Sequence, residues 1–329
     1  MSQRRSGHSI CRVAHELPNQ RTGTMTILLQ QEPARPESAH ARRILRLDSA
    51  LPLSWKAPLD ANAPALGQLG SLETRLARSK AEIRTAQALR YEVFYREGSA
   101  QPSTSARLRG RDADRWDRAC DHLLVIDREC AQQGGIVGTY RFLTGSNAER
   151  AGIDFYTQSE FDIAPLVARH KDLHFMELGR SCVLPQWRTK RTVELLWQGC
   201  WAYVLHNKVD VMIGCASFEG TDPQKLAEAL SFLYHHAAPD EDWRVRARTG
   251  RGVSMNLMPS NEINPKRALH ALPPLIKGYL RLGAWFAGEA VIDRQFATTD
   301  VLVILPVSRL NPRYVNYYGA DAGRRAVTA

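Results

Sequence analysis

The alternation of apolar and polar residues along the chain predicts several strands. Residues 122–130 (HLLVIDREC) and 134–143 (GGIVGTYRFL) are two strand-like runs joined by a polar turn, which is typical of a hairpin. Residues 177–185 (ELGRSCVLP) form a third predicted strand, and residues 298–307 (TTDVLVILPV) form the last one. The continuous apolar run at 209–217 (VDVMIGCAS) indicates a strand in the middle of a sheet.

Four other segments have the spacing of helices. Residues 72–98 begin with a short strand-like run and continue as a helix. Residues 192–208 are apolar nearly all round, which predicts a mostly buried helix. Helices are also expected at 223–236 and 273–288. This order of elements predicts a mixed α/β fold in which helices cover both faces of a central sheet.

Three segments lack such patterns. Residues 1–70 are rich in Arg, Ser, Pro, Gln and Ala, which predicts a mildly basic, disordered arm. Residues 71–329 are then expected to form a single domain. Within it, the polar residues 99–118 predict a mobile loop, and the irregular residues 238–270 predict an insertion before the last helix.

Composition narrows the class of protein. The 329 residues are enough for one large domain or two modest ones. A hydrophobic content of 44% and a charged content of 24% are typical of a soluble globular protein. The net charge of +10 favours an acidic partner, which composition alone leaves open between nucleic acid, an anionic membrane surface and an acidic carrier protein.

The cysteines and the apolar runs help to predict the cellular compartment of the protein. Six scattered cysteines without a C-x-x-C pair favour reduced thiols over a disulfide framework or a zinc site. The first residues do not have the pattern of a signal peptide, and no apolar run has the ~18 residues of a membrane-spanning helix. We therefore expect a cytoplasmic protein that at most attaches peripherally to the inner membrane.

Charge inside an apolar strand is unusual, and the third predicted strand contains Glu177 and Arg180. A buried carboxylate or guanidinium costs several kcal/mol unless it is paired. One interpretation is a structural ion pair. The other is a catalytic carboxylate and its partner on the wall of a cleft.

A second group of side chains is expected near this strand. Arg90 and Phe94 are four residues apart and so share one face of a helix. Asp117 and Asp121 flank the entry to the first strand of the hairpin, and Arg141 lies inside the second. Structural ion pairs explain each charge by itself. Together the charges indicate a polar cleft.

Positive charge gathers after the third predicted strand. Residues 185–192 (PQWRTKRT) carry Arg188, Lys190 and Arg191 where the strand passes into the buried helix. The free N–H groups and the dipole of a helix N-terminus favour anions, although a solvated basic turn explains the same residues. There is no glycine-rich Walker or Rossmann loop in the sequence, which argues against ordinary nucleotide binding.

Nine stretches, in order between about residues 75 and 320, carry a resemblance to one family. They are LRYEVFYRE, DHLLVID, VGTYRFL, SEFDI, ELGRSCVLPQWR, LLWQG, GCASFEGTDP, LPPLIKGYLRLGA and DRQFATTDV. The sequence resembles the L-ornithine Nα-acyltransferases, the ornithine lipid branch of the GNAT-type acyltransferases, which are relatives of the acyl-homoserine-lactone synthases.

The resemblance implies a GNAT-type acyl-CoA N-acyltransferase fold and a reaction. A fatty acyl group, often 3-hydroxylated, would pass from acyl-carrier protein to the α-amine of L-ornithine, which attacks the thioester directly. The product would be lyso-ornithine lipid. We expect no bound cofactor and no metal site, since acyl-carrier protein brings the phosphopantetheine thioester as a substrate.

The resemblance also assigns substrate-binding residues. Arg90 with Phe94 matches the R-x-x-x-F of the synthases, and Arg141 matches the arginine that ends their second strand. Glu177 with Arg180 matches their E-x-x-R.

The acids of the substrate site are assigned less directly. The two acids of the synthases are three residues apart, whereas Asp117 and Asp121 are four apart. Asp114 with Asp117 would keep the spacing. The choice among these three acids stays open at this point.

Three chemical roles follow from the reaction. The attacking amine must lose a proton, and Glu177 is the candidate base, with its pKa tuned by burial against arginine. Backbone N–H groups near Cys182 to Leu184 are candidates for binding the tetrahedral oxyanion. Tyr279 lies before a Leu-Gly pair, as a tyrosine does in many GNAT enzymes, and is the candidate acid for the leaving thiolate, although a core tyrosine is an equal explanation.

The donor is expected to bind at the basic junction. Val183 and Leu184 with Arg188, Lys190 and Arg191 would hold the phosphate of the phosphopantetheine arm. GNAT enzymes that use free CoA commonly have a glycine in this loop, and QWRTKR has none, which suits a donor with one phosphate. A basic face would also dock an acidic carrier protein.

Two alternatives remain. The first is an acyl-carrier-dependent transferase with another amine acceptor, such as lysine, glutamine, glycine or an autoinducer precursor. The second is a non-enzymatic basic protein that binds a membrane or nucleic acid. Nucleic acid is not an expected partner, because the sequence has no helix-turn-helix, zinc-finger or RNA-binding aromatic signature.

Overall fold

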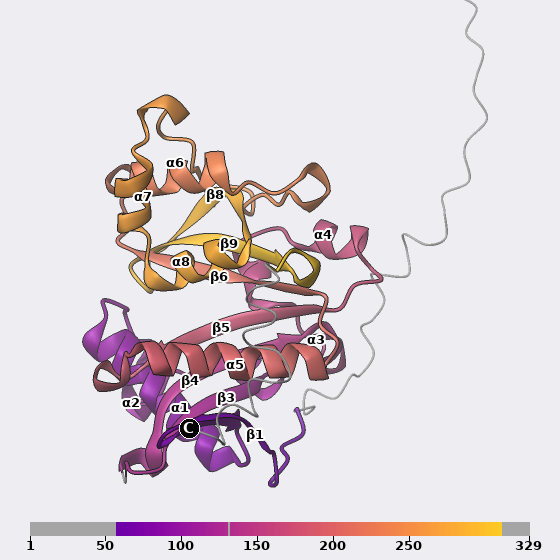
Figure 1. Ribbon diagram of the computed structural model, residues 1–329, viewed down its shortest axis with the longest axis vertical. Helices are drawn as coiled ribbons and strands as arrows, with labels where there is room; N and C mark the ends of the chain where they lie inside the picture. Colours follow the sequence, from indigo (N-terminus) through magenta and orange to yellow (C-terminus); the bar gives the residue numbers. More distant parts are fainter. Residues whose placement is uncertain (1–56, 131, 311–329) are drawn as a thin grey trace, which may run out of the picture. The chain divides into compact units, whose positions relative to one another are not determined.

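The computed structural model describes residues 57–130 and 132–310, and within them nine strands form one mixed sheet. The order is β1-β2-β3-β4-β5-β6-β9-β8-β7 (Figure 1). Every neighbouring pair is antiparallel except β5 and β6, which are parallel. The strands are β1 Ala65–Leu69, β2 Leu72–Leu76, β3 Asp121–Asp127, β4 Ile136–Thr144, β5 Phe175–Val183, β6 Val211–Glu219, β7 Gly252–Ser254, β8 Trp285–Asp293 and β9 Thr298–Pro306.

Helices connect the strands and cover the sheet. The α-helices are α1 Lys80–Tyr91, α2 Thr104–Arg109, α3 Gly145–Ala151, α4 Ala164–Arg169, α5 Lys190–His206, α6 Ala227–His236, α7 Pro265–Ala271 and α8 Pro274–Leu282. A π-helical turn, η1 (Glu92–Glu97), extends α1. The short 3-10 turns are η2 Arg115–Arg118, η3 Gln132–Gly135, η4 Tyr156–Ser159, η5 Pro185–Trp187, η6 Pro223–Leu226, η7 Glu241–Trp243, η8 Ser260–Glu262 and η9 Val307–Arg309.

The period of two along β3 explains how α1 and α5 cover opposite faces of the first strands. Leu124 and Ile126 pack in one cluster with Leu89 of α1. The residues between them, Leu123 and Val125, pack in another cluster with buried residues of α5. Successive strand side chains point to opposite faces, so an unbroken apolar run requires a helix on each side. Figure 1 shows α5 lying along these strands.

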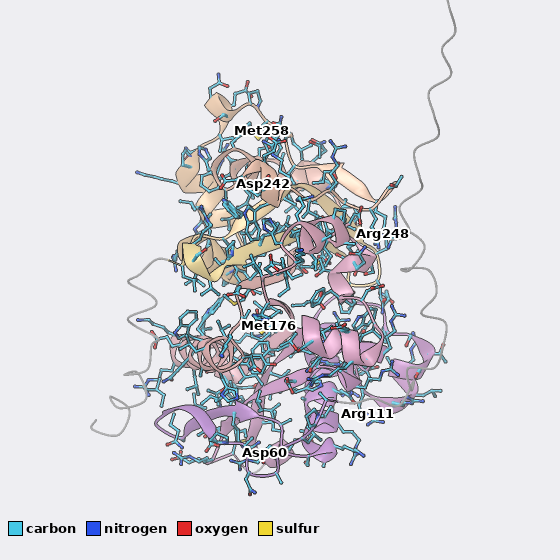
Figure 2. All side chains as sticks on the ribbon, turned by 90° about the vertical axis from the view of Figure 1, so that its right-hand side faces the viewer. Asp60, Arg111, Met176, Asp242, Arg248 and Met258 are labelled. Atoms are coloured by element: carbon cyan, nitrogen blue, oxygen red, sulfur yellow. The ribbon has the colours of Figure 1, made fainter. Side chains whose placement is uncertain are left out.

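The other half of the sheet is built in the same way. Val301 and Val303 of β9 belong to the cluster that contains residues of α6 and α8. Leu302 and Ile304 face the second cluster, which includes Leu166 of α4. Met176 of β5, fully buried, lies in the interior of the domain (Figure 2). Both faces of the central strands are therefore covered, as predicted.

β5 and β6 diverge soon after they begin. Their parallel pairing covers only Phe175–Glu177 of β5, opposite 211–213 of β6. At the point of divergence Gly214 faces the carbonyl oxygen of Leu178, and a Cβ on this glycine would lie 2.4 Å from that oxygen. Beyond this point the two strands have no ladder between them, which leaves space for a site between two halves of one sheet.

A bulge lies on the other side of β5. The register between β4 and β5 shifts between Thr139 and Arg141, so that Arg180 and Ser181 together oppose one residue. Arg180 has a φ of +54°, a left-handed conformation that is uncommon for residues other than glycine. The bulge re-aims the side chains of β5 where it leaves β6.

Several predicted elements are confirmed. β3 and β4 form the expected antiparallel hairpin, and β5, α5 and β9 lie where the pattern placed them. β6 is central, with a neighbour on each side.

Three other predictions are wrong in part. The helix expected at 273–288 ends at Gly283, which has a φ of +94°, and the apolar residues that follow pair with β9 as β8. Residues 99–118 contain α2 and η2 and are not merely a loop. The insertion at 238–270 lies before α8, but it contributes the edge strand β7 and most of α7 to the fold.

The predicted boundary of the arm at residue 70 is also too late. Residues 65–69 form β1, which pairs with β2 and packs against α5. The predicted disorder concerns chiefly residues 1–56, which lie outside the described residues, as do residues 311–329 of the predicted domain.

The divergence predicts a local requirement for glycine. Gly214→Ala is expected to lower the free energy of unfolding by about 1–3 kcal/mol, because its Cβ would overlap a backbone oxygen that cannot move without shifting β5. Gly179→Ala is the matched control, since a Cβ there meets nothing within 4 Å. Urea unfolding measures both variants, and equal losses would contradict the steric argument.

Candidate active site

A cavity of about 270 Å³ lies where β5 and β6 diverge. Residues of both strands line it, together with residues of β4, α8 and the turn between β8 and β9. The lining residues are Phe94, Cys120, Tyr140, Arg141, Leu143, Tyr156, Thr157, Glu177, Leu178, Gly179, Arg180, Ser181, Cys215, Ala216, Ser217, Leu275, Tyr279, Asp293, Phe296 and Asp300. Predicted site residues and residues without an assigned role thus share one cavity.

An ionic network lies behind this wall, and Arg90 is at its centre. This side chain is fully buried and does not line the cavity. Its Nε donates to Asp112 Oδ2 at 2.8 Å, and its two terminal nitrogens donate to the two carboxylate oxygens of Asp117, each at 2.9 Å. Arg90 therefore positions other groups and does not itself reach a ligand in the cavity.

Two further arginines connect the network to the cavity. Arg141 Nη1 donates to Asp114 Oδ1 at 2.7 Å and to Asp117 Oδ1 at 3.0 Å. Arg180 Nε donates to Asp112 Oδ2 at 3.1 Å, and its Nη2 lies 3.5 Å from Asp114 Oδ2. Both side chains line the cavity, so the network presents positive charge to it.

The network stays ionised over the ordinary pH range. Burial by itself would raise the pKa of Asp117, but the charges of Arg90 and Arg141 hold it well below its usual value. The pKa of Asp112 is lowered in the same way, by Arg180 and Arg90 against the effect of burial. Three buried guanidinium groups are thus matched by three carboxylates.

The acids of the network come from the segment that was predicted to be a mobile loop. α2 ends at Gly110 in the left-handed conformation, and the chain then returns so that the N–H of Asp112 donates to the Gln87 carbonyl of α1 at 3.0 Å. Asp114 and Asp117 form a capping box around η2. The loop prediction failed because these polar residues are bonded to buried arginines and not to water.

Arg180 also contacts aromatic rings of the cavity. Its guanidinium carbon lies 4.8 Å from the ring centre of Tyr156 and 4.9 Å from that of Phe296. Phe94 packs edge-on against Phe296, with ring centres 5.8 Å apart. These contacts hold the arginine in one orientation at the cavity wall.

Glu177 lies in the cavity wall and is 6% exposed. Its Oε2 accepts a hydrogen bond from the N–H of Tyr156 at 2.8 Å, and its Oε1 accepts one from the N–H of Thr157 at 2.6 Å. Burial raises the pKa of Glu177, and the hydrogen bonds from Thr157 and Tyr156 partly oppose the rise. The carboxylate is therefore a better base than an exposed one and is held against η4.

Tyr279 lies in the same cavity, on α8. Its hydroxyl forms a short hydrogen bond with the hydroxyl of Tyr140, and its ring packs edge-on against Trp197 at 5.4 Å. Burial raises the pKa of Tyr279 well above its usual value, so the hydroxyl keeps its proton at neutral pH. Tyr279 is therefore both a buried core residue and a residue of the cavity wall.

Asp121 is not brought to the site. Its Oδ2 accepts a hydrogen bond from the Tyr203 hydroxyl at 2.6 Å, and it does not line the cavity. Of the three candidate acids, the structure places Asp114 and Asp117, which are three residues apart, in the ionic network.

The five predicted donor-binding residues do not line the cavity. Arg188 is already paired with Glu97, with Nη2 donating to Oε2 at 2.6 Å. The N–H of Leu184 donates to the Val137 carbonyl at 2.9 Å and is unavailable to an oxyanion. Lys190 is exposed, and its Nζ lies 3.4 Å from Glu194 of the next helical turn.

The other two residues predicted to bind the acyl donor, Val183 and Arg191, lie before and after this turn. Arg191 is exposed at the start of α5, and Val183 accepts from Arg188 Nε at 3.0 Å through its carbonyl oxygen. A phosphate at this turn would therefore meet three exposed cations, of which Arg188 and Lys190 already have a carboxylate partner.

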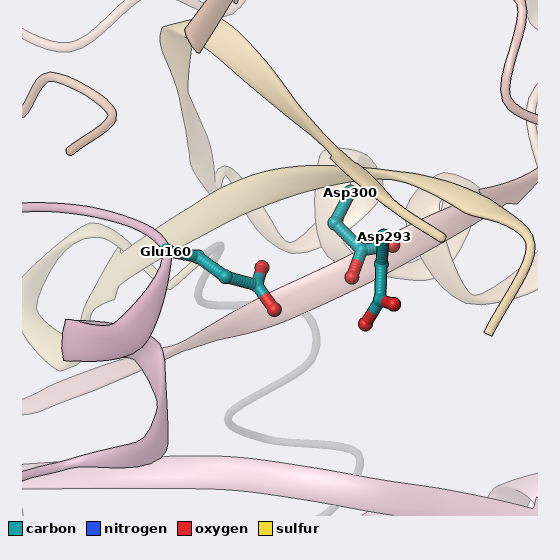
Figure 3. Close-up of side chains that lie close together, drawn as sticks. All are labelled: Glu160, Asp293 and Asp300. Atoms are coloured by element: carbon teal, nitrogen blue, oxygen red, sulfur yellow. The ribbon is translucent and has the colours of Figure 1, made fainter. Parts of the chain in front are cut away.

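A second carboxylate cluster adjoins the cavity. Glu160, Asp293 and Asp300 each offer an oxygen, and these three oxygens lie within 4.8 Å of one another (Figure 3). Burial raises the pKa of Glu160 to about 8, and Asp300 adds to the rise. In the part of the chain that the structure describes, this is the one group of acids, cysteines or histidines placed to share a cation.

Four of these acids had no role assigned from the sequence. Asp112 lay in a segment taken as a loop, although three aspartates within 112–117 were a visible signal. Asp300 stands inside an otherwise apolar strand, the same kind of signal that drew attention to Glu177. Glu160 and Asp293 carry no local signal, because folding alone brings them together.

Comparisons with known proteins bear on this site. Residues 89–198, which include most of the network and β5, match the model of the acetyltransferase (GNAT) domain. The L-ornithine N(alpha)-acyltransferase of Rhizobium meliloti is 57% identical over 267 residues, which cover 80% of this chain and 90% of that protein. The protein of the same name from Agrobacterium fabrum is 54% identical over 265 residues, with 80% and 90% covered.

The solved structures that are similar include a distant match. FeeM, an N-acyl amino acid synthase from uncultured soil microbes, is 12% identical, with 72% of this chain and 91% of that chain covered and a TM-score of 0.40. Separately, none of the helices in the described part of the chain combines the length and the apolar character needed to cross a membrane.

The GNAT-domain match and the names of these two relatives together define the class: this is a GNAT-type N-acyltransferase. The two relatives share more than half of their aligned residues with the chain over most of its length. The chain belongs to the L-ornithine N(alpha)-acyltransferase family. The resemblance carried by the nine stretches is thereby confirmed, as are the expected fold and enzyme class.

The network predicts that Arg90 is needed for stability. Arg90→Gln is expected to lower the free energy of unfolding by about 3–5 kcal/mol, because it removes the fully buried charge that Asp112 and Asp117 share and leaves only one arginine beside each of them. Arg96→Gln is the matched control: Arg96 forms an exposed pair with Glu92, and its loss is expected to cost under about 1 kcal/mol. Urea unfolding tests both, and a small loss for Arg90→Gln would contradict the assignment.

The pKa of Glu160 predicts a pH-dependent stability. Its folded-state pKa of about 8 exceeds the ordinary value of 4.5, so its contribution to stability is complete below pH 4.5 and is lost as the pH rises through 8. Glu160→Gln removes this dependence. Relative to wild type, the variant is expected to gain about 1 kcal/mol or more between pH 5 and pH 8.5. Denaturant unfolding at both pH values measures the gain, and parallel losses would contradict it.

Proposed function

We propose that this protein transfers a fatty acyl group from a thioester donor to the α-amine of L-ornithine. The observation that carries the proposal is the identity of 57% and 54%, over 80% of the chain, to two proteins named L-ornithine N(alpha)-acyltransferase. The acylated amino acid keeps its carboxylate and its side-chain amine and would be the lyso precursor of ornithine lipid.

Glu177 is the proposed general base. The substrate α-amine is an ammonium at neutral pH and must lose a proton before its nitrogen can attack the thioester carbon. Burial raises the pKa of Glu177, which brings its basicity closer to that of the amine. Each oxygen already accepts one backbone hydrogen bond, but a carboxylate has about four lone pairs, so it can accept a proton directly or through water.

The tetrahedral intermediate needs hydrogen-bond donors and an acid. The bulge at Arg180 and Ser181 interrupts the ladder with β4 inside the cavity, so its backbone N–H groups replace Leu184 as the proposed oxyanion donors. When the C–S bond breaks, the electron pair leaves on sulfur, and the attacking nitrogen, positively charged in the intermediate, releases its second proton to solvent, from which Tyr279 regains the proton that it donates. Tyr279, which stays protonated at neutral pH, is the proposed donor of a proton to that thiolate.

Arg141 and Arg180 are the proposed partners of the ornithine carboxylate. Both line the cavity and are held by aspartates behind it, so their positions are set before the substrate arrives. Arg90 and Asp117 do not contact the substrate in this proposal; they position Arg141 and Arg180. Phe94 supports the ring on which Arg180 lies.

The proposed donor is acyl-carrier protein. The turn after β5 has no glycine, and Lys190 and Arg191 are exposed at the N-terminus of the 17-residue helix α5, where one phosphate and an acidic protein surface would be favoured. Peripheral contact with an anionic inner-membrane surface, in a cytoplasmic protein, stays a prediction from the net charge of +10.

Acyl transfer tests this proposal with purified protein, 3-hydroxyacyl carrier protein and radiolabelled amino acids. A labelled lipid is expected from ornithine, and Glu177→Gln should slow its formation by about 10²–10⁴-fold, because the base is removed while the carboxamide stays similar in size. Glu219→Gln, an exposed position on β6, is the control and should retain the wild-type rate.

The outcomes separate the parts of the proposal. Product from acyl-CoA but not from the carrier protein would overturn the donor. Product from another amine alone would overturn the acceptor. If no product forms from any amine with either donor, the proposed acyltransferase activity is overturned and a basic binding protein is favoured.

A further inference from the structure

Two buried carboxylate oxygens beside the cavity have no hydrogen-bond partner. They are Glu160 Oε2 and Asp300 Oδ1, in side chains that are 2% and 5% exposed. Among the ion pairs of the described residues, no Lys or Arg lies within 4.0 Å of either acid or of Asp293. Glu160 and Asp300 are thus buried acids in each of which one oxygen lacks a donor. A cation from outside the chain, placed between them, would supply donors to these oxygens and offset the cost of burying charged carboxylates.

Their place in the fold explains how a ligand reaches them. Asp300 of β9 and Asp293 at the end of β8 line the cavity, and Glu160 follows η4 directly. Figure 3 shows the three carboxylates turned toward one another from separate segments. A cation held between them would therefore be in contact with the space in which the α-amine reacts.

We propose that Glu160, Asp293 and Asp300 bind the terminal ammonium group of the amino-acid acceptor and select a diamino acid. This inference rests on the proposed function, because it assigns the second amine of the acceptor. The α-amine reacts near Glu177, and the side-chain amine remains charged in the carboxylate cluster.

The geometry suits an alkylammonium. Such a group has three N–H donors, and at a tetrahedral nitrogen with N···O distances of about 2.8 Å the three acceptors are about 4.6 Å apart. The three oxygens here lie within 4.8 Å of one another. Calcium, in contrast, takes about six to eight oxygen ligands, and the cluster supplies three side chains.

A short series of contacts connects the cluster to the base. The two nitrogens of ornithine are separated by five bonds, about 6 Å when extended. Glu177 accepts from the N–H of Thr157, and the Thr157 hydroxyl accepts from the Cys215 thiol at 3.8 Å. The sulfur of Cys215 also lies beside the Glu160 carboxyl group. The base and the cluster are thus neighbours across two intervening side chains that line the same cavity.

Norvaline tests this assignment, because it has the carbon chain of ornithine without the terminal amine. The measured quantity is the ratio of kcat/KM for ornithine to that for norvaline. Wild type is expected to prefer ornithine strongly, because burying the carboxylates without their ammonium partner is unfavourable. Asp300→Asn and Glu160→Gln are each expected to lower the ratio about tenfold or more, mainly through the KM for ornithine.

Matched measurements keep the test independent of folding. Asp162→Asn changes an exposed acid two residues from Glu160 and should leave the ratio at its wild-type value. Thermal unfolding of each variant establishes that it is folded. In wild type, ornithine should raise Tm more than an equal concentration of norvaline does.

Four results would overturn the inference while leaving the proposed function intact. They are equal kcat/KM for the two acceptors in wild type, an unchanged ratio in both folded variants, equal Tm shifts, and activity that EDTA abolishes and Ca²⁺ or Mg²⁺ restores. The last would identify the cluster as a metal site. Failure of the proposed function is different, since wild type would then acylate neither amino acid.

Discussion

Charge neutralisation behind the cavity is the constraint on which the rest of this domain depends. Three arginines from α1, β4 and β5 converge in an interior that would not tolerate any one of them alone. The segment that contains Asp112 and Asp117 therefore folds back across α1 and supplies the matching carboxylates. The network ties elements that are far apart in sequence to one another, and it fixes the two guanidinium groups that line the cavity.

The opening between β5 and β6 is rigid for a related reason. A ladder that ends after three residue pairs would leave two loose edges, but β5 remains paired with β4 and β6 remains paired with β9 along its whole length. The opening is therefore held from both sides, and strands of the sheet carry Arg141, Glu177 and Arg180 on its walls. Catalytic and substrate-binding groups on such walls need little ordering when a ligand binds.

Much of the fold was predictable, because the period of two and the buried helical pattern are local signals. The error at α8 arose because the apolar stretch before β8 suits a helix or a strand equally, and only Gly283 ends the helix. Glu177 and Arg180 stood out because charge is rare within an apolar strand. Asp112 and Glu160 did not, since their surroundings are polar in sequence and become buried only through contacts with distant segments.

The turn η4 links the two acids that are proposed to bind the two amines of the substrate. Glu177 is bonded to the backbone N–H groups at the start of this turn, and Glu160 follows its end. One short piece of backbone therefore contacts one carboxylate and carries the other. If the two acids bind the two amines as proposed, this backbone would set the spacing between those amines. A diamine one methylene longer would have to bend, and one a methylene shorter would reach both groups only if the turn, and with it the base, moved. In the proposed mechanism, residues 156–160 thus affect both the choice of substrate length and the position of the base.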